Sequence, residues 1–141
     1  MNIREVAERL FDLIPAISSS ILKDHNIEEI SRQQFELLIK VNINNGKPMS
    51  YYSNQLKISK PALTCISEKL IDIGFLERGA SYEDRRIVTL NITNEGKDFL
   101  TCKKKKIIDS IQNKLSVLSE EETNKLQECI EEILRIIRKI F

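Results

Sequence analysis

The sequence lacks the residue patterns on which most enzyme sites are built. Its 141 residues contain no tryptophan, four glycines and a single histidine, His25, which stands in a polar stretch without a nearby serine or cysteine nucleophile motif. No G-x-S-x-G pattern and no glycine-rich phosphate loop occurs. With so few glycines, few backbone positions can cradle a phosphate. These absences predict a protein that is not an enzyme, without catalytic residues and without a cofactor.

Disulfide, metal and membrane signals are also missing. The three cysteines (Cys65, Cys102 and Cys129) are odd in number and widely spaced, with no C-x-x-C pair. This argues against a disulfide framework and against a zinc site. No apolar run approaches the roughly 20 residues that span a bilayer, and the N-terminus has no secretory leader pattern. We therefore expect reduced thiols, no metal, no membrane contact and a cytoplasmic location.

Charge is distributed unevenly along the chain, although the formal net charge is only +1. Residues 47–106 hold 12 Lys and Arg against 7 Asp and Glu, a net charge of +5. Residues 1–46 and residues 107–141 each hold 5 against 7, a net charge of −2. Such asymmetry favours an anionic partner for the middle segment, although a charge run is also typical of a solvated surface.

Apolar periodicity predicts helices in the first third of the chain. Residues 3–23 form an amphipathic pattern, within which Pro15 predicts a kink or a break. A second helix is expected from Ser31, as N-cap, to Asn42. Residues 44–48 have the composition of a turn.

Two short helices in the middle of the chain predict a helix-turn-helix. Ser50 is expected to cap a helix over residues 51–57. Ser59 is expected to cap a longer helix, with Pro61 in its first turn. This helix is expected to run to Ile73, where Gly74 ends it. Two short helices joined by a tight turn are typical of DNA-binding motifs. The buried face of the longer helix is expected to consist of Leu63, Ile66, Leu70 and Ile73.

A β-hairpin and two further helices complete the predicted order. Residues 75–78 and 87–92 are expected as strands, with a charged loop, 79–86, between them. Thr93 should cap a helix to about Leu118, and a capping box at Ser119 should open a last helix to about Ile140. The predicted fold class is mainly α with a small β-hairpin wing, a winged helix-turn-helix. The apolar stripes of the terminal helices must pack on each other or on a second chain.

The middle of the sequence resembles the MarR (multiple antibiotic resistance regulator) family. The resemblance rests on residues 59–64, on residues 74–78, and on the wing signature Asp-x-Arg, strand, Thr-x-x-Gly within residues 84–96. It covers residues 31–100, while the flanking helices agree in length and order only. The resemblance implies an N-terminal dimerisation helix (1–30), a winged helix-turn-helix DNA-binding domain (31–98) and C-terminal dimerisation helices (99–141).

The resemblance also implies a function. Members of the family are obligate homodimers that bind double-stranded DNA at pseudo-palindromic operators, mostly as repressors. Many are released by a small aromatic effector or by thiol oxidation. The effector cleft would lie between the dimerisation helices and the winged domain, where Leu13, Ile17 and Phe35 are candidates. Ordinary core packing is the alternative role for each of the three.

The longer helix of the helix-turn-helix supplies most of the candidate DNA contacts, because such a helix presents its N-terminal side chains to bases in the major groove. Ser59 is expected mainly as a helix cap, and a contact with a base is its alternative role. In the family the position that matches Cys65 is often arginine. Because this chain has no arginine there, the operator sequence and the affinity for DNA cannot be inferred from the resemblance. Cys65 is either a thiol sensor or a small side chain that fits the groove or the edge of the core. Ser50, at the start of the preceding helix, is expected near a phosphate. The full set of candidates in the two helices is Ser50, Ser59, Lys60, Pro61, Ala62, Thr64, Cys65, Ser67 and Lys69.

The wing supplies the remaining candidates. Arg85 and Arg86 suit a narrow minor groove, where the negative potential attracts guanidinium groups. By resemblance, Asp84 orients Arg86, which reaches the groove; a surface salt bridge of little energetic value is the alternative. The lysine run 103–106 either steers the protein to DNA or is solvated helix surface.

A protein-interaction adaptor with a winged helix is the rival function. The net charge of +5 in residues 47–106 argues against a protein that mimics DNA. The missing arginine at position 65 is compatible with an adaptor that does not bind DNA specifically. Salt-dependent affinity for duplex DNA separates the two readings, because neutralising phosphates releases counterions.

Overall fold

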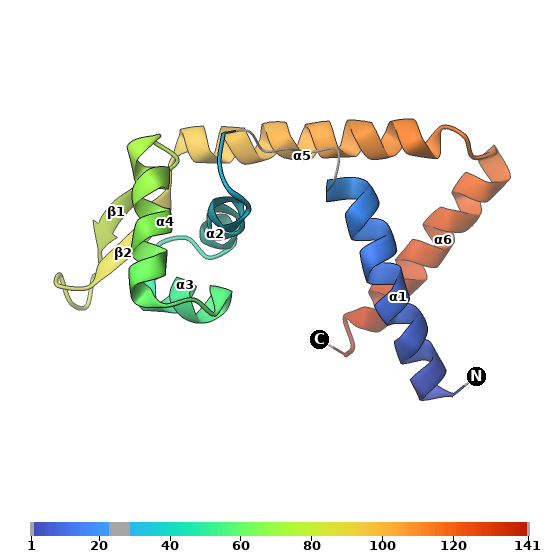
Figure 1. Cartoon of the computed structure of the whole chain (residues 1–141), viewed down its shortest axis with the longest axis horizontal. Coiled ribbons are helices and arrows are strands. Elements are labelled where there is room, and N and C mark those ends of the chain that lie inside the picture. Colours follow the sequence, from blue (N-terminus) through green and yellow to red (C-terminus); the bar gives the residue numbers. More distant parts are fainter. Residues whose placement is uncertain (1, 23–28, 141) are drawn as a thin grey trace. The chain divides into compact units, whose positions relative to one another are not determined.

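A computed structural model of the chain describes residues 2–22 and 29–140 (Figure 1). The chain forms two compact units, residues 1–105 and residues 106–141, and each is described by itself. His25 lies outside the described residues.

The first helix, α1 (Ile3–Leu22), is continuous. Pro15 lies inside it, so of the kink or break expected there, the break is excluded. Proline removes one backbone donor, but the turns on either side keep their own hydrogen bonds and the helix continues. The apolar side chains of α1 include Ile3 and Phe11, which are 90% and 73% exposed.

The second helix, α2 (Arg32–Ile43), begins as the sequence predicts. The Ser31 hydroxyl accepts from the backbone N–H of Gln34 at 3.2 Å, and the Gln34 side chain accepts from the backbone N–H of Ser31 at 2.7 Å. This capping box satisfies two N–H groups that have no partner within the helix. The helix places Leu37, Leu38 and Val41 in the core.

The third helix, α3 (Met49–Leu56), begins one residue before the predicted cap. Pro48, with φ −59° and ψ 154°, is the N-cap, and no side chain caps the helix. Ser50 is therefore inside the first turn, and its carbonyl accepts from the Ser53 hydroxyl at 3.0 Å. The prediction that Ser50 is the cap is wrong, because the extended residue that precedes a helix is supplied here by the fixed φ of Pro48.

The fourth helix, α4 (Lys60–Asp72), has the predicted N-cap. The Ser59 hydroxyl accepts from the backbone N–H of Ala62 at 3.2 Å. After the helix, Gly74 has φ 86°, the left-handed conformation that glycine adopts without strain, and Phe75 donates its backbone N–H to the carbonyl of Leu70 at 2.8 Å. Ile73, predicted to be buried, is 48% exposed because it is the C-cap, where the chain leaves the helix.

The wing is an antiparallel hairpin of β1 (Leu76–Ala80) and β2 (Val88–Ile92). Its register pairs Leu76 with Ile92 and Ala80 with Val88. The strands agree with the predicted ones to within two residues at each end, and the loop between them is residues 81–87.

A short segment pairs with the other edge of β2. Leu90 accepts from the backbone N–H of Gly46 at 2.9 Å and donates its own N–H to the carbonyl of Lys47 at 3.1 Å. Pro48 and Thr89 form an antiparallel bridge beside them. The turn before α3 is thus fixed to the wing by backbone hydrogen bonds.

The fifth helix, α5 (Asn94–Leu115), begins very close to the end of α4. Thr93 accepts from the backbone N–H of Gly96 at 3.1 Å and donates its hydroxyl to the carbonyl of Gly74 at 2.5 Å. A Cβ at Gly96 would lie 2.3 Å from the carbonyl oxygen of Phe75. The Thr-x-x-Gly pattern therefore combines a helix cap with a residue that must lack a side chain.

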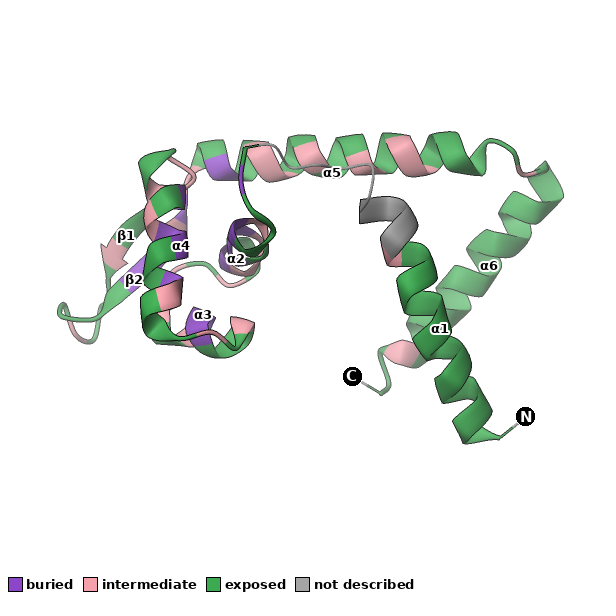
Figure 2. Ribbon diagram, viewed as in Figure 1, coloured by how far each residue is buried: buried purple, intermediate pink, exposed green. Residues whose placement is uncertain are grey.

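One hydrophobic core lies among α2, α3, α4 and the hairpin (Figure 2). Tyr52 is its largest fully buried side chain, and partly buried hydrophobic side chains pack against it. Phe35 is half-buried and packs against this core. The buried apolar members are Ile30, Leu37, Leu38, Val41, Tyr52, Leu63, Ile66, Leu70, Leu76, Leu90 and Ile92.

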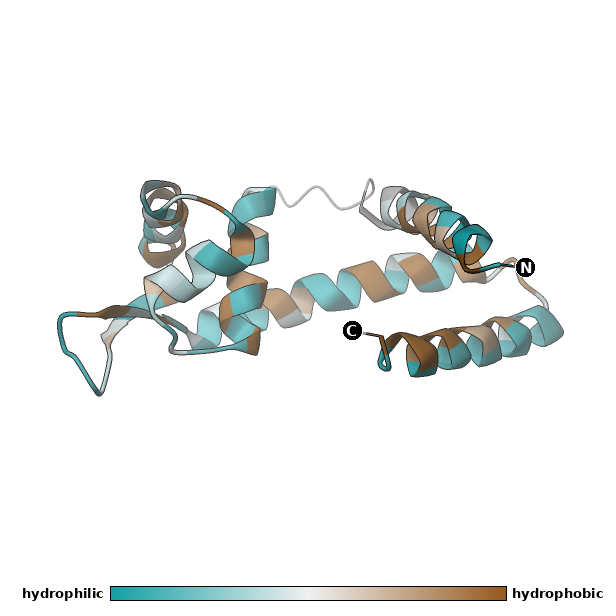
Figure 3. Ribbon diagram, turned by 90° about the horizontal axis from the view of Figure 1, so that it is seen from below, coloured by the Kyte–Doolittle hydropathy of each residue, from teal (hydrophilic) through white to brown (hydrophobic). Residues whose placement is uncertain are grey.

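The second unit contains the end of α5 and the last helix, α6 (Glu120–Ile137). Ser119 forms the predicted capping box with Glu122, with distances of 3.2 and 2.9 Å. No residue of α6 is buried, although one side of the helix is strongly apolar (Figure 3). None of the helices in the described part of the chain is long and apolar enough to cross a membrane.

Candidate nucleic-acid interface

Helix α4 has one buried side and one exposed side. Leu63, Ile66 and Leu70 are in the core, and residues three or four positions apart share a face of a helix. The opposite side carries a line of residues at this spacing, which we call the outward stripe. It consists of Pro61, Cys65, Glu68 and Asp72, of which Glu68 is half-buried and the others are exposed.

Most of the side chains predicted at the start of α4 are accessible. Thr64 is exposed, and its hydroxyl donates to the carbonyl of Lys60 at 3.0 Å, so its oxygen keeps acceptor capacity. Ala62 is half-buried. The other exposed candidates are Ser59, Lys60, Pro61, Cys65 and Lys69.

Ser67 is not accessible, and the expectation that it is exposed is wrong. Its exposed fraction is 0%, and its hydroxyl donates to the carbonyl of Thr64 at 3.0 Å. Ser67 lies four residues after Leu63 and three before Leu70, so it is on the buried side of the helix. A serine is tolerated there because its own helix satisfies the hydroxyl.

Helix α3 is held in place by Tyr52. The Tyr52 hydroxyl donates to the carbonyl of Asn44 and accepts from the backbone N–H of Lys47 at 3.2 Å. Burial raises the pKa of Tyr52; the hydrogen bond from Lys47 opposes this shift, and the neighbouring Tyr51 adds to it. Ser50 is exposed in the first turn of this helix. The tyrosine thus ties the turn before α3 to the core beneath α4.

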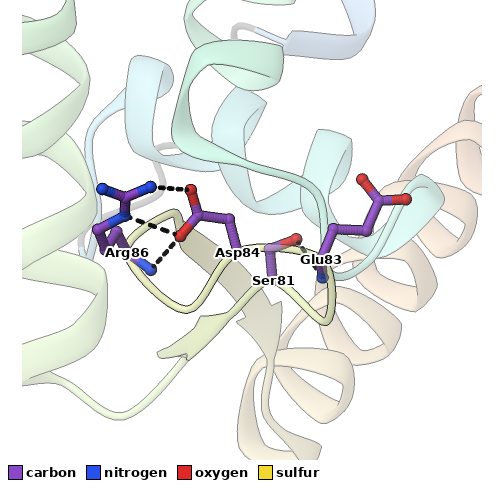
Figure 4. Close-up of polar contacts among 4 residues, drawn as sticks. All are labelled: Ser81, Glu83, Asp84 and Arg86. Atoms are coloured by element: carbon purple, nitrogen blue, oxygen red, sulfur yellow. Dashed lines mark hydrogen bonds and ion pairs between the residues drawn. The ribbon is translucent and has the colours of Figure 1, made fainter.

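In the wing, Asp84 aligns Arg86 (Figure 4). The Asp84 carboxylate accepts from the backbone N–H of Arg86 at 3.0 Å, from Nε at 3.1 Å and from Nη2 at 3.2 Å. The Arg86 side chain is nevertheless 91% exposed. The side-chain hydrogen bonds from Arg86, followed by its backbone N–H, hold the pKa of Asp84 below its ordinary value of 3.8. A guanidinium held at one end by a carboxylate and otherwise open to solvent is suited to an external anion.

The rest of the loop is also open. Arg85 is exposed, and the ring of Tyr82 is fully exposed. The backbone N–H of Glu83 donates to the Ser81 hydroxyl at 3.3 Å, which shapes the turn at the tip (Figure 4). In the lysine run, Lys103 lies with its Nζ 5.4 Å from the centre of the Phe99 ring, and the other three lysines are exposed.

One contact at this surface was missed by sequence reasoning. Arg78 of β1 forms a hydrogen-bonded ion pair with Glu68 of α4. The two residues are ten positions apart, in different elements, so no helical or strand spacing signals the pair. It depends on how the hairpin packs against α4, which only the tertiary structure shows.

Possible metal-ligating side chains are not clustered in the part of the chain that the structure describes. In residues 2–22 and 29–140, no three histidine, cysteine or carboxylate side chains are grouped so as to hold a metal ion. The three cysteines are exposed and form no disulfide.

Comparisons with known proteins agree with this architecture. The family model described as MarR family matches residues 30–88. The uncharacterised HTH-type transcriptional regulator YpoP of Bacillus subtilis is 29% identical over 73 residues. That match covers 52% of this chain and 52% of the relative, so the chain spans about half the length of the curated relative it matches.

Solved structures match over nearly the whole chain. The transcriptional regulator Tm0710 of Thermotoga maritima superposes with a TM-score of 0.77, at 22% identity, over 98% of this chain and 95% of that one. FabT of Streptococcus pneumoniae, solved in complex with DNA, superposes with a TM-score of 0.57, at 20% identity, over 99% and 97%. At these identities the likeness shows the fold. The match of residues 30–88 to the MarR family model and the wing signature agree with this fold, so the winged helix-turn-helix of this chain is similar to that of MarR-family proteins.

Proposed function

We propose that this protein is a transcription regulator that binds double-stranded DNA, with α4 in the major groove and the wing in the adjacent minor groove. The observation that carries the proposal is the alignment of Arg86. An exposed guanidinium held by Asp84 suits the minor groove, while the accessible side chains at the start of α4 suit base edges and phosphates.

The charge distribution favours DNA over a protein partner. The net charge of +5 in residues 47–106 falls on the segment that contains α3, α4 and the wing. Phosphate contacts supply most of the affinity of such domains, and they make it depend on salt. The adaptor reading predicts no such dependence.

We further propose that the protein acts as a homodimer. Large apolar side chains are left exposed on helices that have a polar side as well, and exposed apolar patches of this kind mark interaction surfaces. A second copy supplies a matching face and places two α4 helices for a pseudo-palindromic operator. The exposed residues are Ile3, Phe11 and Ile14 of α1, and Leu126, Ile130, Ile133, Leu134 and Ile136 of α6.

Repression, with release by a small aromatic ligand or an oxidant, is the regulatory part of the proposal. Leu13 and Ile17 are 41% and 48% exposed on α1, which leaves them open to a ligand. Phe35 packs against the core, and this packing accounts for its position without a ligand. Cys65 is exposed on the outward stripe, where an oxidised thiol would add negative charge to the DNA-facing surface.

The test is binding to genomic DNA fragments, including the DNA upstream of the protein's own gene, measured by fluorescence anisotropy at two salt concentrations under reducing conditions. We expect selective binding that weakens steeply with salt. Arg86→Ala should lower the affinity about tenfold and reduce the salt slope by about one. Arg32→Ala is the matched control, because Arg32 is an exposed arginine paired with Glu36 on α2, away from the wing.

Weak binding that is equal for all fragments and unaffected by Arg86→Ala would overturn the DNA proposal in favour of an adaptor. Sedimentation equilibrium on the same samples tests the dimer separately, because a monomer that binds one half-site would contradict only that part.

A further inference from the structure

The outward stripe of α4 contains a carboxylate where a DNA-facing helix would be expected to avoid one. Glu68 lies three residues after Cys65 and seven after Pro61, in the middle of the stripe. An acidic side chain facing duplex DNA is repelled by phosphates, so an unpaired Glu68 would weaken binding to every sequence equally.

The ion pair with Arg78 changes this balance. One guanidinium nitrogen of Arg78 donates to Oε1 of Glu68, and both side chains remain about half exposed, 49% and 45%. Arg78 is itself fixed, because β1 holds it in register opposite Leu90 of β2. The pair neutralises the carboxylate towards the phosphates and limits its rotation.

The carboxylate of Glu68 keeps free acceptor capacity in this arrangement. A carboxylate has about four lone-pair directions, and the structure gives one contact, on Oε1, to Arg78. Oε2 therefore remains able to accept a hydrogen bond from outside the protein. A carboxylate accepts hydrogen bonds and donates none.

We propose that Glu68, held by Arg78, is a specificity-determining residue that accepts a hydrogen bond from the exocyclic amino group of a cytosine. This inference rests on the proposed function, in which α4 enters the major groove. There, guanine presents two acceptors and thymine an acceptor with a methyl group, whereas cytosine presents its N4 amino donor. Adenine presents a donor beside an acceptor, which a carboxylate satisfies less well. The carboxylate thus selects a C·G pair at one position of each half-site.

The experiment is binding-site selection from a pool of random duplexes, performed with the full chain. The wild type should enrich cytosine at one position of each half-site. Glu68→Gln should reduce that preference about tenfold and raise the frequency of adenine there, because a glutamine amide pairs with N6 and N7 of adenine. All other positions of the site should keep their preferences.

Glu77→Gln is the matched control. It removes the same charge from the neighbouring strand residue, which points to the other face of the hairpin from Arg78. It should leave every base preference unchanged. Thermal unfolding of both variants is measured in parallel, so that a loss of folded protein is recognised.

The outcomes separate this inference from the function on which it rests. A wild type that selects a site, together with a Glu68→Gln variant that selects the same site with an unchanged cytosine preference, overturns the role of Glu68 and leaves DNA binding intact. In that case the ion pair only ties α4 to β1, and Glu68→Gln would lower thermal stability alone. A wild type that enriches no site overturns both.

Discussion

Gly96→Ala tests the close approach between α5 and the end of α4. The added Cβ would stand 2.3 Å from the carbonyl oxygen of Phe75 and 2.9 Å from Cγ1 of Ile92. The isoleucine side chain can rotate, but the carbonyl is backbone and accepts the N–H of Thr93 at 3.1 Å. Relieving the clash therefore requires the backbone to shift and weakens that hydrogen bond.

Two opposing terms set the magnitude. Alanine is favoured over glycine inside a helix by about 1 kcal/mol. Overpacking against atoms that cannot move costs up to about 3 kcal/mol. We therefore expect Gly96→Ala to lower the free energy of unfolding by about 2 kcal/mol, a large part of the stability of a small domain.

Urea unfolding at a fixed protein concentration measures this effect, because the midpoint of an associating protein depends on concentration. Lys97→Ala is the control, since Lys97 is the exposed neighbour in the same helical turn and its change should stay within about 0.5 kcal/mol. A Gly96→Ala protein that is as stable as the wild type, or more stable, would show that helix propensity outweighs the close contact and would refute the reasoning.

Three further predictions concern hydrogen bonds of the fold and the wing. Tyr52→Phe leaves two backbone groups without the buried hydroxyl and should cost about 1–3 kcal/mol in urea unfolding, so an unchanged midpoint would contradict the role of that hydroxyl. Thr93→Val keeps the shape but removes both the cap and the donor to the Gly74 carbonyl, and should cost about 1–2 kcal/mol; a neutral effect would mean that water replaces both bonds. The pKa of Asp84 is lowered in the folded protein, so the pair with Arg86 is complete above the ordinary value of 3.8 and is lost as the pH falls through the folded pKa. Carboxyl carbon shifts followed by NMR should show this low midpoint and its return towards 3.8 in Arg86→Ala, whereas equal midpoints would argue against the pair.

Signals that act over a few residues allowed much of the fold to be predicted. Ser31, Ser59 and Ser119 cap their helices as expected, because the capping hydroxyl and the N–H groups it satisfies lie within three residues. Ser50 does not cap its helix, because Pro48, two residues earlier, supplies the extended N-cap. Pro48 and Ser50 are both residues that can begin a helix, and the sequence does not show which of the two does so.

The candidate site was less predictable, because it depends on which side of each element is covered. Ser67 was expected at the surface among the N-terminal side chains of its helix, yet its spacing from Leu63 and Leu70 puts it in the core. The pair of Glu68 and Arg78 required the packing of the hairpin on α4. The Asp84–Arg86 pair was expected from the family resemblance, and the structure contains it between two residues of one loop.

The pairing of residues 46–48 with β2 has a consequence for aggregation. The stretch Val88–Ile92 is rich in β-branched and apolar residues and carries no charge, which is typical of segments that add to foreign strands. One of its edges is covered by β1, and the other is bonded at Leu90 by Gly46 and Lys47. Asn45 also accepts the backbone N–H of Ile92 through its side chain, at 2.8 Å. The short turn before α3 therefore closes an edge along which copies of this protein could otherwise polymerise strand by strand.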